Sequence, residues 1–169
     1  MRSIVSGIGG AGGAVATVAF FLPWLSVSCD DMPLAEISAY DRASGIQVTE
    51  YRSITTTDDE LVEPKPSYWA FLALPIALLA LTGAQSMPNV EKRRLLGAAT
   101  AAVGLMGIAL LTTFWLEQRF GLIPPETVTP QLELIIETHI GGWLSLAGHG
   151  LGLLSGTLSV ILGPHLAAA

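Results

Sequence analysis

Long uncharged hydrophobic stretches alternate with polar stretches along the chain, and this alternation predicts membrane-spanning helices. Four stretches, at about residues 4–28, 67–86, 95–116 and 140–162, contain no Asp, Glu, Lys or Arg. At about 1.5 Å per residue, a helix of about 20 residues crosses the hydrocarbon core of a bilayer. The pattern therefore predicts an all-α membrane protein, in which residues 1–169 form a single integral membrane domain built as a four-helix bundle.

The polar stretches differ in charge, and the difference predicts the orientation of the chain. Of the 14 acidic residues, nine fall in residues 29–66, four in residues 117–139 and one, Glu91, in residues 87–94, beside Lys92, Arg93 and Arg94. Short loops rich in Lys and Arg stay on the cytoplasmic side. We therefore expect residues 87–94 to form an inner loop of the cell membrane, residues 29–66 and 117–139 to form outer loops, and both termini to be cytoplasmic.

The four tryptophans follow the same orientation. Trp24, Trp69, Trp115 and Trp143 each lie where an apolar stretch meets one of the outer loops. Indole rings concentrate at the interface between membrane and water, because the ring is apolar and its N–H group donates a hydrogen bond. The sequence therefore predicts a belt of tryptophans at the outer interface.

Both outer loops carry local patterns of secondary structure. In the first loop, Leu34–Tyr40 and Ile46–Ile54 are separated by residues typical of a turn, and the second segment is rich in β-branched residues. These features predict a small extracytoplasmic β-hairpin. In the second loop, apolar residues follow Thr129 and Pro130 at helical spacing, which predicts an amphipathic helix over about residues 132–140 that continues into the last span.

Small residues recur at the four-residue spacing of one helix face, and such faces let two helices approach closely. They include one G-x-x-x-G pair in the first span, one glycine of the Ala- and Gly-rich third span and a ladder in the fourth span: Gly9, Gly13, Gly104, Gly148, Gly152 and Gly156. These faces offer more contact surface than one four-helix bundle needs, so we expect other membrane protein subunits, together with bound lipids, as partners. Gly7, Gly9 and Gly12 also match G-x-G-x-x-G, but no strand precedes them, and a dinucleotide site needs one.

The chain shows few residues able to carry chemistry. Its spans contain no charged side chain, whereas ion-coupled carriers and proton pumps need intramembrane acids or bases. No metal-ligand motif, phosphate-binding loop or nucleophile with its base occurs. Cys29 is the single cysteine, so no intrachain disulfide forms. We expect a protein that is not an enzyme, holds no metal ion and binds no nucleic acid.

Among the acidic and basic residue types, His149 is the one that lies inside a predicted span, and two roles are open for it. It stands between Gly148 and Gly150, whose small size leaves flat space for a tetrapyrrole, and a neutral imidazole is an axial ligand of haem or chlorophyll. The alternative is a hydrogen bond from His149 to a serine, a threonine or a carbonyl group of another helix.

The boundary of the first span resembles a known pattern. The sequence Pro23-Trp24-Leu25-Ser26-Val27-Ser28-Cys29, followed by Ile37–Gly45, resembles small bacterial four-span proteins of uncharacterised function with a P-W-x-x-x-S-C motif. The layout is also similar to that of claudin-type tetraspan proteins, which have a long first outer loop. Both resemblances imply a topology and an outer-loop fold, and neither implies an activity.

Together these features favour a non-catalytic integral membrane subunit that packs on a larger membrane complex and stabilises it. One alternative is a tetrapyrrole-binding subunit of a photosynthetic or respiratory complex, with His149 as the ligand. A second is an oligomeric channel or claudin-like junction protein. The acidic outer loops also suit a soluble partner of basic charge.

Overall fold

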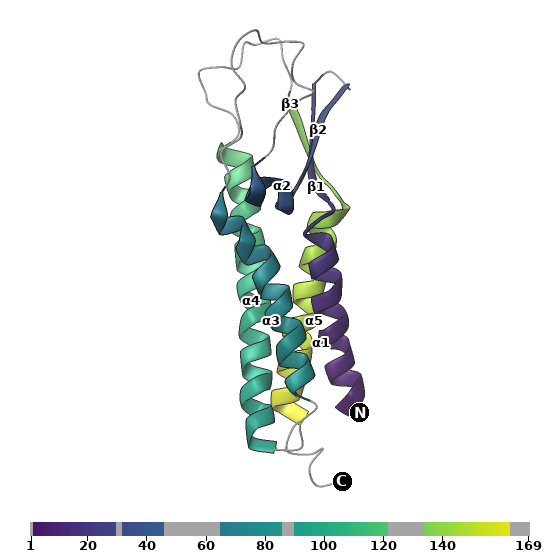
Figure 1. Cartoon of the computed structure of the whole chain (residues 1–169), viewed down its shortest axis with the longest axis vertical. Coiled ribbons are helices and arrows are strands. Elements are labelled where there is room, and N and C mark those ends of the chain that lie inside the picture. Colours follow the sequence, from purple (N-terminus) through teal and green to yellow (C-terminus); the bar gives the residue numbers. More distant parts are fainter. Residues whose placement is uncertain (1, 30–31, 46–64, 86–89, 122–133, 163–169) are drawn as a thin grey trace.

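Four long helices lie side by side and carry a small β-sheet at one end (Figure 1). The computed structural model describes residues 2–29, 32–45, 65–85, 90–121 and 134–162. The helices are α1 (Arg2–Ala19), α3 (Ala70–Ala84), α4 (Val90–Gly121) and α5 (Ile140–Leu162). Helix α1 packs on α3 and α5, and α4 packs on α3 and α5, so the helices form a closed ring.

Three helical stretches of the described chain are long and apolar enough to cross a membrane: Pro66–Ala84, Lys92–Leu116 and Ile140–Leu162. The protein is therefore embedded in a membrane. The apolar stretch of α1 is shorter and covers Ser3–Ala19. The predicted span at 140–162 has the same bounds as α5, whereas α4 extends beyond the predicted span at 95–116 at both ends.

The prediction of one span over residues 4–28 is wrong for its last nine residues, 20–28. Helix α1 ends at Ala19, and the chain then tightens into 3₁₀-type bonds, from Phe20 N–H to the Thr17 carbonyl and from Leu22 N–H to the Ala19 carbonyl. Pro23 lacks the N–H that a continuing helix needs, and strand β1 (Pro23–Cys29) begins there. The residues of β1 are uncharged, so hydropathy alone did not separate the strand from the helix.

The sheet has three antiparallel strands in the order β2-β1-β3. Strand β2 spans Met32–Ser38, and β3 spans Leu134–Thr138. Strand β2 overlaps the first predicted hairpin strand, but its neighbour is β1, and the other predicted strand, residues 46–54, lies outside the described residues. The predicted amphipathic helix at 132–140 is also wrong, because residues 134–138 form β3: a short run rich in β-branched residues suits both patterns, and pairing with β1 decides between them.

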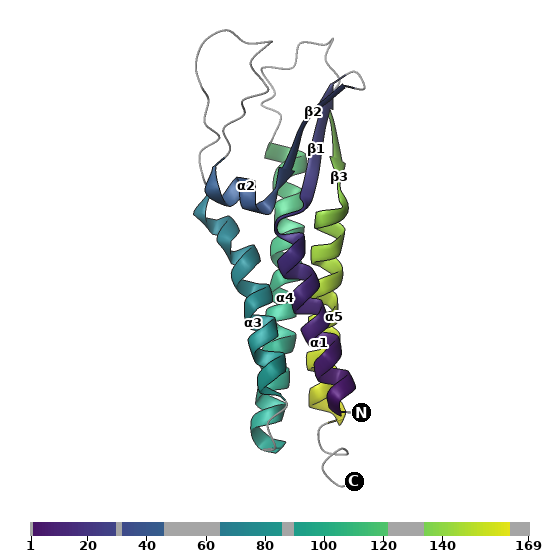
Figure 2. The same cartoon turned by 45° about the vertical axis from the view of Figure 1, so that its right-hand side comes forward.

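Two short helices close the junction between the sheet and the bundle (Figure 2). Helix α2 (Ala39–Ser44) begins with a capping box, in which the Ser38 hydroxyl accepts from Asp41 N–H at 3.1 Å and the Asp41 carboxylate accepts from Ser38 N–H at 2.8 Å. The 3₁₀ helix η2 (Pro66–Trp69) leads into α3, and Lys65 N–H donates to the Arg42 carbonyl at 3.0 Å. Segments far apart in sequence are thus joined just beyond the helix ends.

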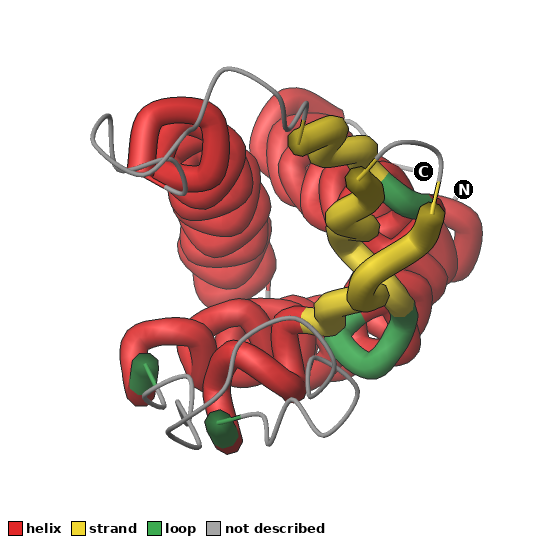
Figure 3. Tube along the Cα trace, turned by 90° about the horizontal axis from the view of Figure 1, so that it is seen from above, coloured by secondary structure: helices red, strands yellow, loops and turns green. Residues whose placement is uncertain are grey.

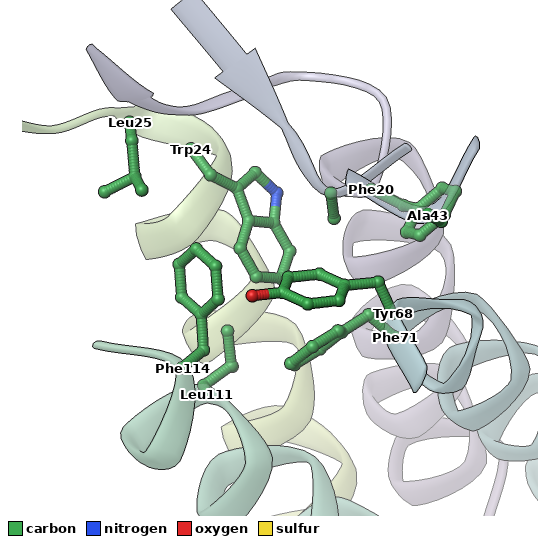
Figure 4. Close-up of a cluster of buried hydrophobic side chains, with 9 residues drawn as sticks. Phe20, Trp24, Leu25, Ala43, Tyr68, Phe71, Leu111 and Phe114 are labelled. Carbon is green, nitrogen blue, oxygen red and sulfur yellow. The ribbon is translucent and has the colours of Figure 1, made fainter. Parts of the chain in front are cut away.

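The hydrophobic core of this junction is aromatic (Figure 4). The Trp24 ring lies 5.1 Å from Phe71 and 5.3 Å from Phe114, in each case edge to face. The buried members of the core come from both short and long elements: Phe20, Trp24, Leu25, Ala39, Ala43, Tyr68, Phe71, Leu111 and Phe114. This core fixes the sheet and α2 to the upper ends of α3 and α4.

Candidate functional site

A column of polar side chains runs along the buried face of α5. Ser145, His149 and Ser155 are fully buried, and Ser159 is 8% exposed. Ser145 and His149, and likewise Ser155 and Ser159, are four residues apart and so are neighbours on the helix surface, and the burial of all four shows that they point into the bundle. In an apolar environment an unpaired polar group is costly, so the partners of this column decide what it does.

At the end of the bundle far from the sheet, Gln85 connects the polar column of α5 to two other helices. The Gln85 side chain donates to the Thr100 hydroxyl of α4 at 2.6 Å and accepts from the Ser159 hydroxyl of α5 at 2.8 Å. Thr100 in turn donates to the Leu96 carbonyl at 2.7 Å. Hydrogen bonds between side chains of different helices are a main source of helix association in membranes. Gln85 is therefore a clamp between α3, α4 and α5.

Sequence reasoning missed this clamp. Gln85 lies in an uncharged stretch, and its side chain did not count against the span. An amide side chain within the predicted span at 67–86 was nevertheless an available signal, because such groups are found mainly where another helix satisfies them, and Gln85 directly follows the end of α3.

Ser155 links α5 to α1. Its hydroxyl donates to the backbone carbonyl of Val5 at 2.7 Å. The close approach depends on Gly9 of α1, since a Cβ built on Gly9 would lie only 2.6 Å from the Ser155 hydroxyl oxygen. Gly9 therefore packs against α5 as predicted, and its lack of a side chain makes room for a hydrogen bond between α1 and α5.

His149 lies deep in the bundle with its ring against Gly107 of α4. Its Nδ1 donates to the Ser145 carbonyl at 2.8 Å, a bond within α5 and not between helices, which fixes the proton on Nδ1. A Cβ built on Gly107 would lie 2.5 Å from His149 Cγ and nearer still to the edge of the ring. Gly107 is therefore the recess that accepts the imidazole.

This arrangement does not fit a tetrapyrrole. The ring edge that carries Nε2 faces the Gly107 backbone, so no plane for a macrocycle lies between His149 and α4. The expected flat space beside Gly148 is filled by α1, because a Cβ there would meet the Gly12 carbonyl oxygen at 2.5 Å and Ala16 Cβ at 2.8 Å. Of the two glycines that flank His149, Gly150 is the one whose built Cβ would have nothing within 4 Å.

The glycines predicted to pack helices all contact other helices of the same chain. A Cβ on Gly13 would lie 3.0 Å from the Pro75 carbonyl oxygen of α3, and one on Gly152 would lie 2.8 Å from Leu78 of the same helix. Gly104 meets the backbone of Leu153, and Gly156 meets the backbone of Ala101. Since the small-residue faces are occupied within the bundle, they no longer argue for partner subunits.

The four tryptophans lie at the end of the bundle that carries the sheet, but in different surroundings. Trp69 and Trp143 are 43% and 56% exposed, as residues of an interfacial belt are expected to be. Trp115 packs on Trp143 with ring centroids 5.4 Å apart. Trp24 is only 1% exposed and donates from Nε1 to the Ala19 carbonyl at 2.6 Å, so it belongs to the core and not to the belt.

Within the described ranges, no three His, Cys, Asp or Glu residues come together to hold a metal ion. Comparison of the chain with protein-family models, with curated proteins and with solved structures gives no match. The site is therefore characterised by its geometry alone: a polar column that holds helices together, beneath an aromatic core that supports the sheet.

Proposed function

We propose that the protein is a non-catalytic membrane subunit that spans the bilayer four times and presents its outer β-sheet to a protein partner. Helix α1 is the fourth span in this proposal. Its apolar stretch of 17 residues lies at the lower limit for crossing, about 17 residues, and it packs along α5 and α3 through Gly9, Gly12 and Gly13.

The observation that carries the proposal is the firm attachment of the sheet to a closed bundle. Strand β1 follows α1 after three residues, and β3 precedes α5 with only His139 between them. The His139 N–H donates to the Trp24 carbonyl at 2.8 Å, and the Tyr40 N–H donates to the Phe20 carbonyl at 3.1 Å. Seen from above, the strands stand over the end of the bundle where α1 and α5 emerge (Figure 3).

The two faces of the sheet differ in the way that a docking element requires. Leu25 of β1 is buried on the face that packs on the bundle. Ser26, on the opposite face, pairs with Glu36 of β2 on one side and with Glu137 of β3 on the other, and both glutamates are exposed. Two carboxylates thus flank one serine on the outer face, which suits a partner surface of positive charge.

The interior of the bundle supports a role without catalysis or transport. The polar column on α5 is engaged mainly in bonds between and within helices, and the aromatic core closes its outer end. The tight seat of His149 on Gly107 argues against the alternative of a tetrapyrrole-binding subunit. The partner, in this proposal, is met by the sheet and not by the glycine faces.

Site-specific photo-crosslinking in native membranes tests the proposal. A photoreactive residue at Glu36 or at Ser26, both on the face of the sheet that points away from the bundle, is expected to give an adduct with a different protein. Leu105 and Ile76 are matched controls, because they are exposed along α4 and α3 and are expected to crosslink lipid. The double variant Glu36→Gln, Glu137→Gln is expected to lower the yield of the adduct at Ser26, which lies between the two glutamates.

Two results would refute the proposal or change it. Protein adducts from Leu105 or Ile76 but not from the sheet positions would move the interface to the lipid-facing helices. Adducts with twice the mass of the chain would identify a second copy as the partner and favour an oligomeric channel or junction protein instead.

A further inference from the structure

The sheet has an open edge along strand β3. Strand β1 lies in the middle and pairs on both sides, so β2 and β3 are the two edge strands. Within the described chain no further strand pairs with β3, and β1 is the element that packs extensively on it. An edge strand carries a row of unpaired N–H and C=O groups, and these groups can pair with an extended segment of another protein.

The pairing of β3 with β1 shows which backbone groups point toward this open edge. The His139 N–H donates to the Trp24 carbonyl, and the register of the two strands continues from there without a shift. In an antiparallel ladder, hydrogen-bonded and non-hydrogen-bonded pairs alternate along each strand. The backbone groups of Glu137 therefore point toward β1, whereas those of Ile136 and Thr138 point toward the open edge.

The opposite edge, along β2, is less suited to the addition of a strand. It contains Pro33, which has no N–H to donate, and its register with β1 shifts between Val27 and Ser28. Proline and irregular pairing are means by which edge strands avoid pairing with other chains. The five residues of β3 include no proline or lysine, and their register with β1 is regular. A further strand is therefore expected beside β3.

Charge indicates what kind of strand fits this edge. Glu137 is exposed and lies beside Ser26 on the face of the sheet that points away from the bundle. The residue directly opposite Glu137 on an added strand would have its Cβ about 4.5–5.5 Å away, and opposite charges at this distance stabilise a strand pair. We propose that an extended segment of the partner protein adds to β3 as a fourth strand, with a lysine or arginine opposite Glu137. This inference rests on the proposed function and adds to it the mode of attachment.

A second copy of the chain suits this edge poorly. Strand β3 runs along the long axis of the bundle in both side views (Figures 1 and 2), so antiparallel pairing of two β3 strands would need copies inserted in opposite orientations in one membrane. Pairing of two copies would also bring together chains that each carry a net charge of −6 and an exposed Glu137. The partner strand is therefore assigned to a different protein.

Charge reversal on either side of Ser26 tests the inference, with a photoreactive residue at Ser26 in native membranes. In the proposed order of strands, Glu137 lies one strand spacing from the added strand and Glu36 three spacings, about 5 Å against about 14 Å. Glu137→Lys is expected to lower the yield of the adduct with a different protein about tenfold, and the matched variant Glu36→Lys about twofold or less. Equal losses from the two variants would overturn the inference but not the proposed function, since they would indicate docking on the face of the sheet.

A second pair of variants tests the backbone of the edge. Ile136→Pro removes an N–H that points toward the open edge and leaves the hydrogen bonds between β3 and β1 in place, so it is also expected to lower the yield of the adduct at Ser26. Ile136→Val keeps the N–H and is expected to leave the yield unchanged. The unfolding temperature of each purified variant shows whether the sheet is intact, and if Ile136→Pro does not fold, the charge reversals decide.

Three outcomes would overturn the strand addition. An undiminished adduct from folded Ile136→Pro would do so and leave the proposed function standing. An adduct with twice the mass of the chain would identify a second copy at this edge. The absence of any protein adduct from Ser26 and Glu36 would overturn the strand addition together with the proposed function.

Discussion

The seat of His149 on Gly107 gives the sharpest prediction for stability. In the variant Gly107→Ala, the new Cβ would collide with the edge of the imidazole, and the ring is backed by α5 and held by its bond to the Ser145 carbonyl. The ring must therefore move away from α4 or turn and lose that bond. Either response separates α4 from α5 near the middle of both helices.

The expected loss of stability is the sum of two unfavourable contributions and one favourable contribution. Overpacking of a tight interior costs about 1–3 kcal/mol. Loss of the bond from His149 to Ser145 costs about 0.5–1.5 kcal/mol. Replacing a helical glycine by alanine returns about 1 kcal/mol through helix propensity. We therefore expect Gly107→Ala to lower the free energy of unfolding by about 1–3 kcal/mol. For a chain of this size, each kcal/mol changes the midpoint temperature of thermal unfolding by about 2–4 °C, so the midpoint is expected to fall by several degrees.

Thermal unfolding in mild detergent, followed by size-exclusion chromatography at a fixed heating rate, measures the change. Gly150→Ala is the matched control, because Gly150 is also a helical glycine beside His149 but has nothing within 4 Å of its built Cβ. It is expected to be neutral or stabilising. The second variant, His149→Ala in the Gly107→Ala background, is expected to lose less than the two single effects added together, since the collision is gone. Equal unfolding temperatures for Gly107→Ala and Gly150→Ala would refute the close contact between the His149 ring and Gly107.

Three further predictions concern the clamp, the aromatic core and the topology. Gln85→Leu removes two hydrogen bonds between helices and leaves the Ser159 hydroxyl without its acceptor, so we expect the free energy of unfolding to fall by about 1–2 kcal/mol in the same assay. The control Thr157→Ala, at an exposed site, is expected to be nearly neutral. Equal losses from the two variants would show that Gln85 does not hold the helices together. Trp24→Ala is expected to lower the free energy of unfolding by about 3–5 kcal/mol, and Trp24→Phe by clearly less, because the buried ring fills the aromatic core at the junction. A small effect of both variants would contradict this expectation, since it would mean that the core closes around the space left by the ring. In a background without the native cysteine, Ser44→Cys is expected to react with an impermeant thiol reagent outside the cell and Arg94→Cys only after the membrane is opened; labelling of both from one side would refute the topology.

The membrane-embedded helices were predictable because their signal is long-range and simple. A stretch of about 20 residues without charge indicates a membrane-spanning helix, and the bounds of α5 coincide with such a stretch. The sheet was less predictable because its strands are short and belong to two different loops. Residues 23–29 carry no charge and so continued the predicted span, and residues 134–138 fit a helical spacing as well as a strand. Only the pairing of β1 with both neighbours settles the choice, and pairing between distant segments leaves no local mark.

The candidate site shows the same division. Glycine ladders and the lone histidine were visible in the sequence, but their partners were not. Nothing in the sequence connects Gly107 to His149 or Gln85 to Ser159, because the connection depends on the rotation of each helix about its axis. The expectation of outside subunits arose from this gap, because the sequence does not show that the six predicted packing glycines contact other helices of the same chain.

The pairing of the first and last parts of the chain also sets the order in which it can be assembled. During synthesis, α1 leaves the ribosome long before α5, and β1 before β3, although each is packed against the other in the finished protein. Until the last segment is inserted, the glycine-lined side of α1 has only α3 to hold it, and β1 lacks one of its two neighbours. A premature stop before residue 134 would therefore leave a product in which α1 lacks its contact with α5 and β1 lacks its pairing with β3.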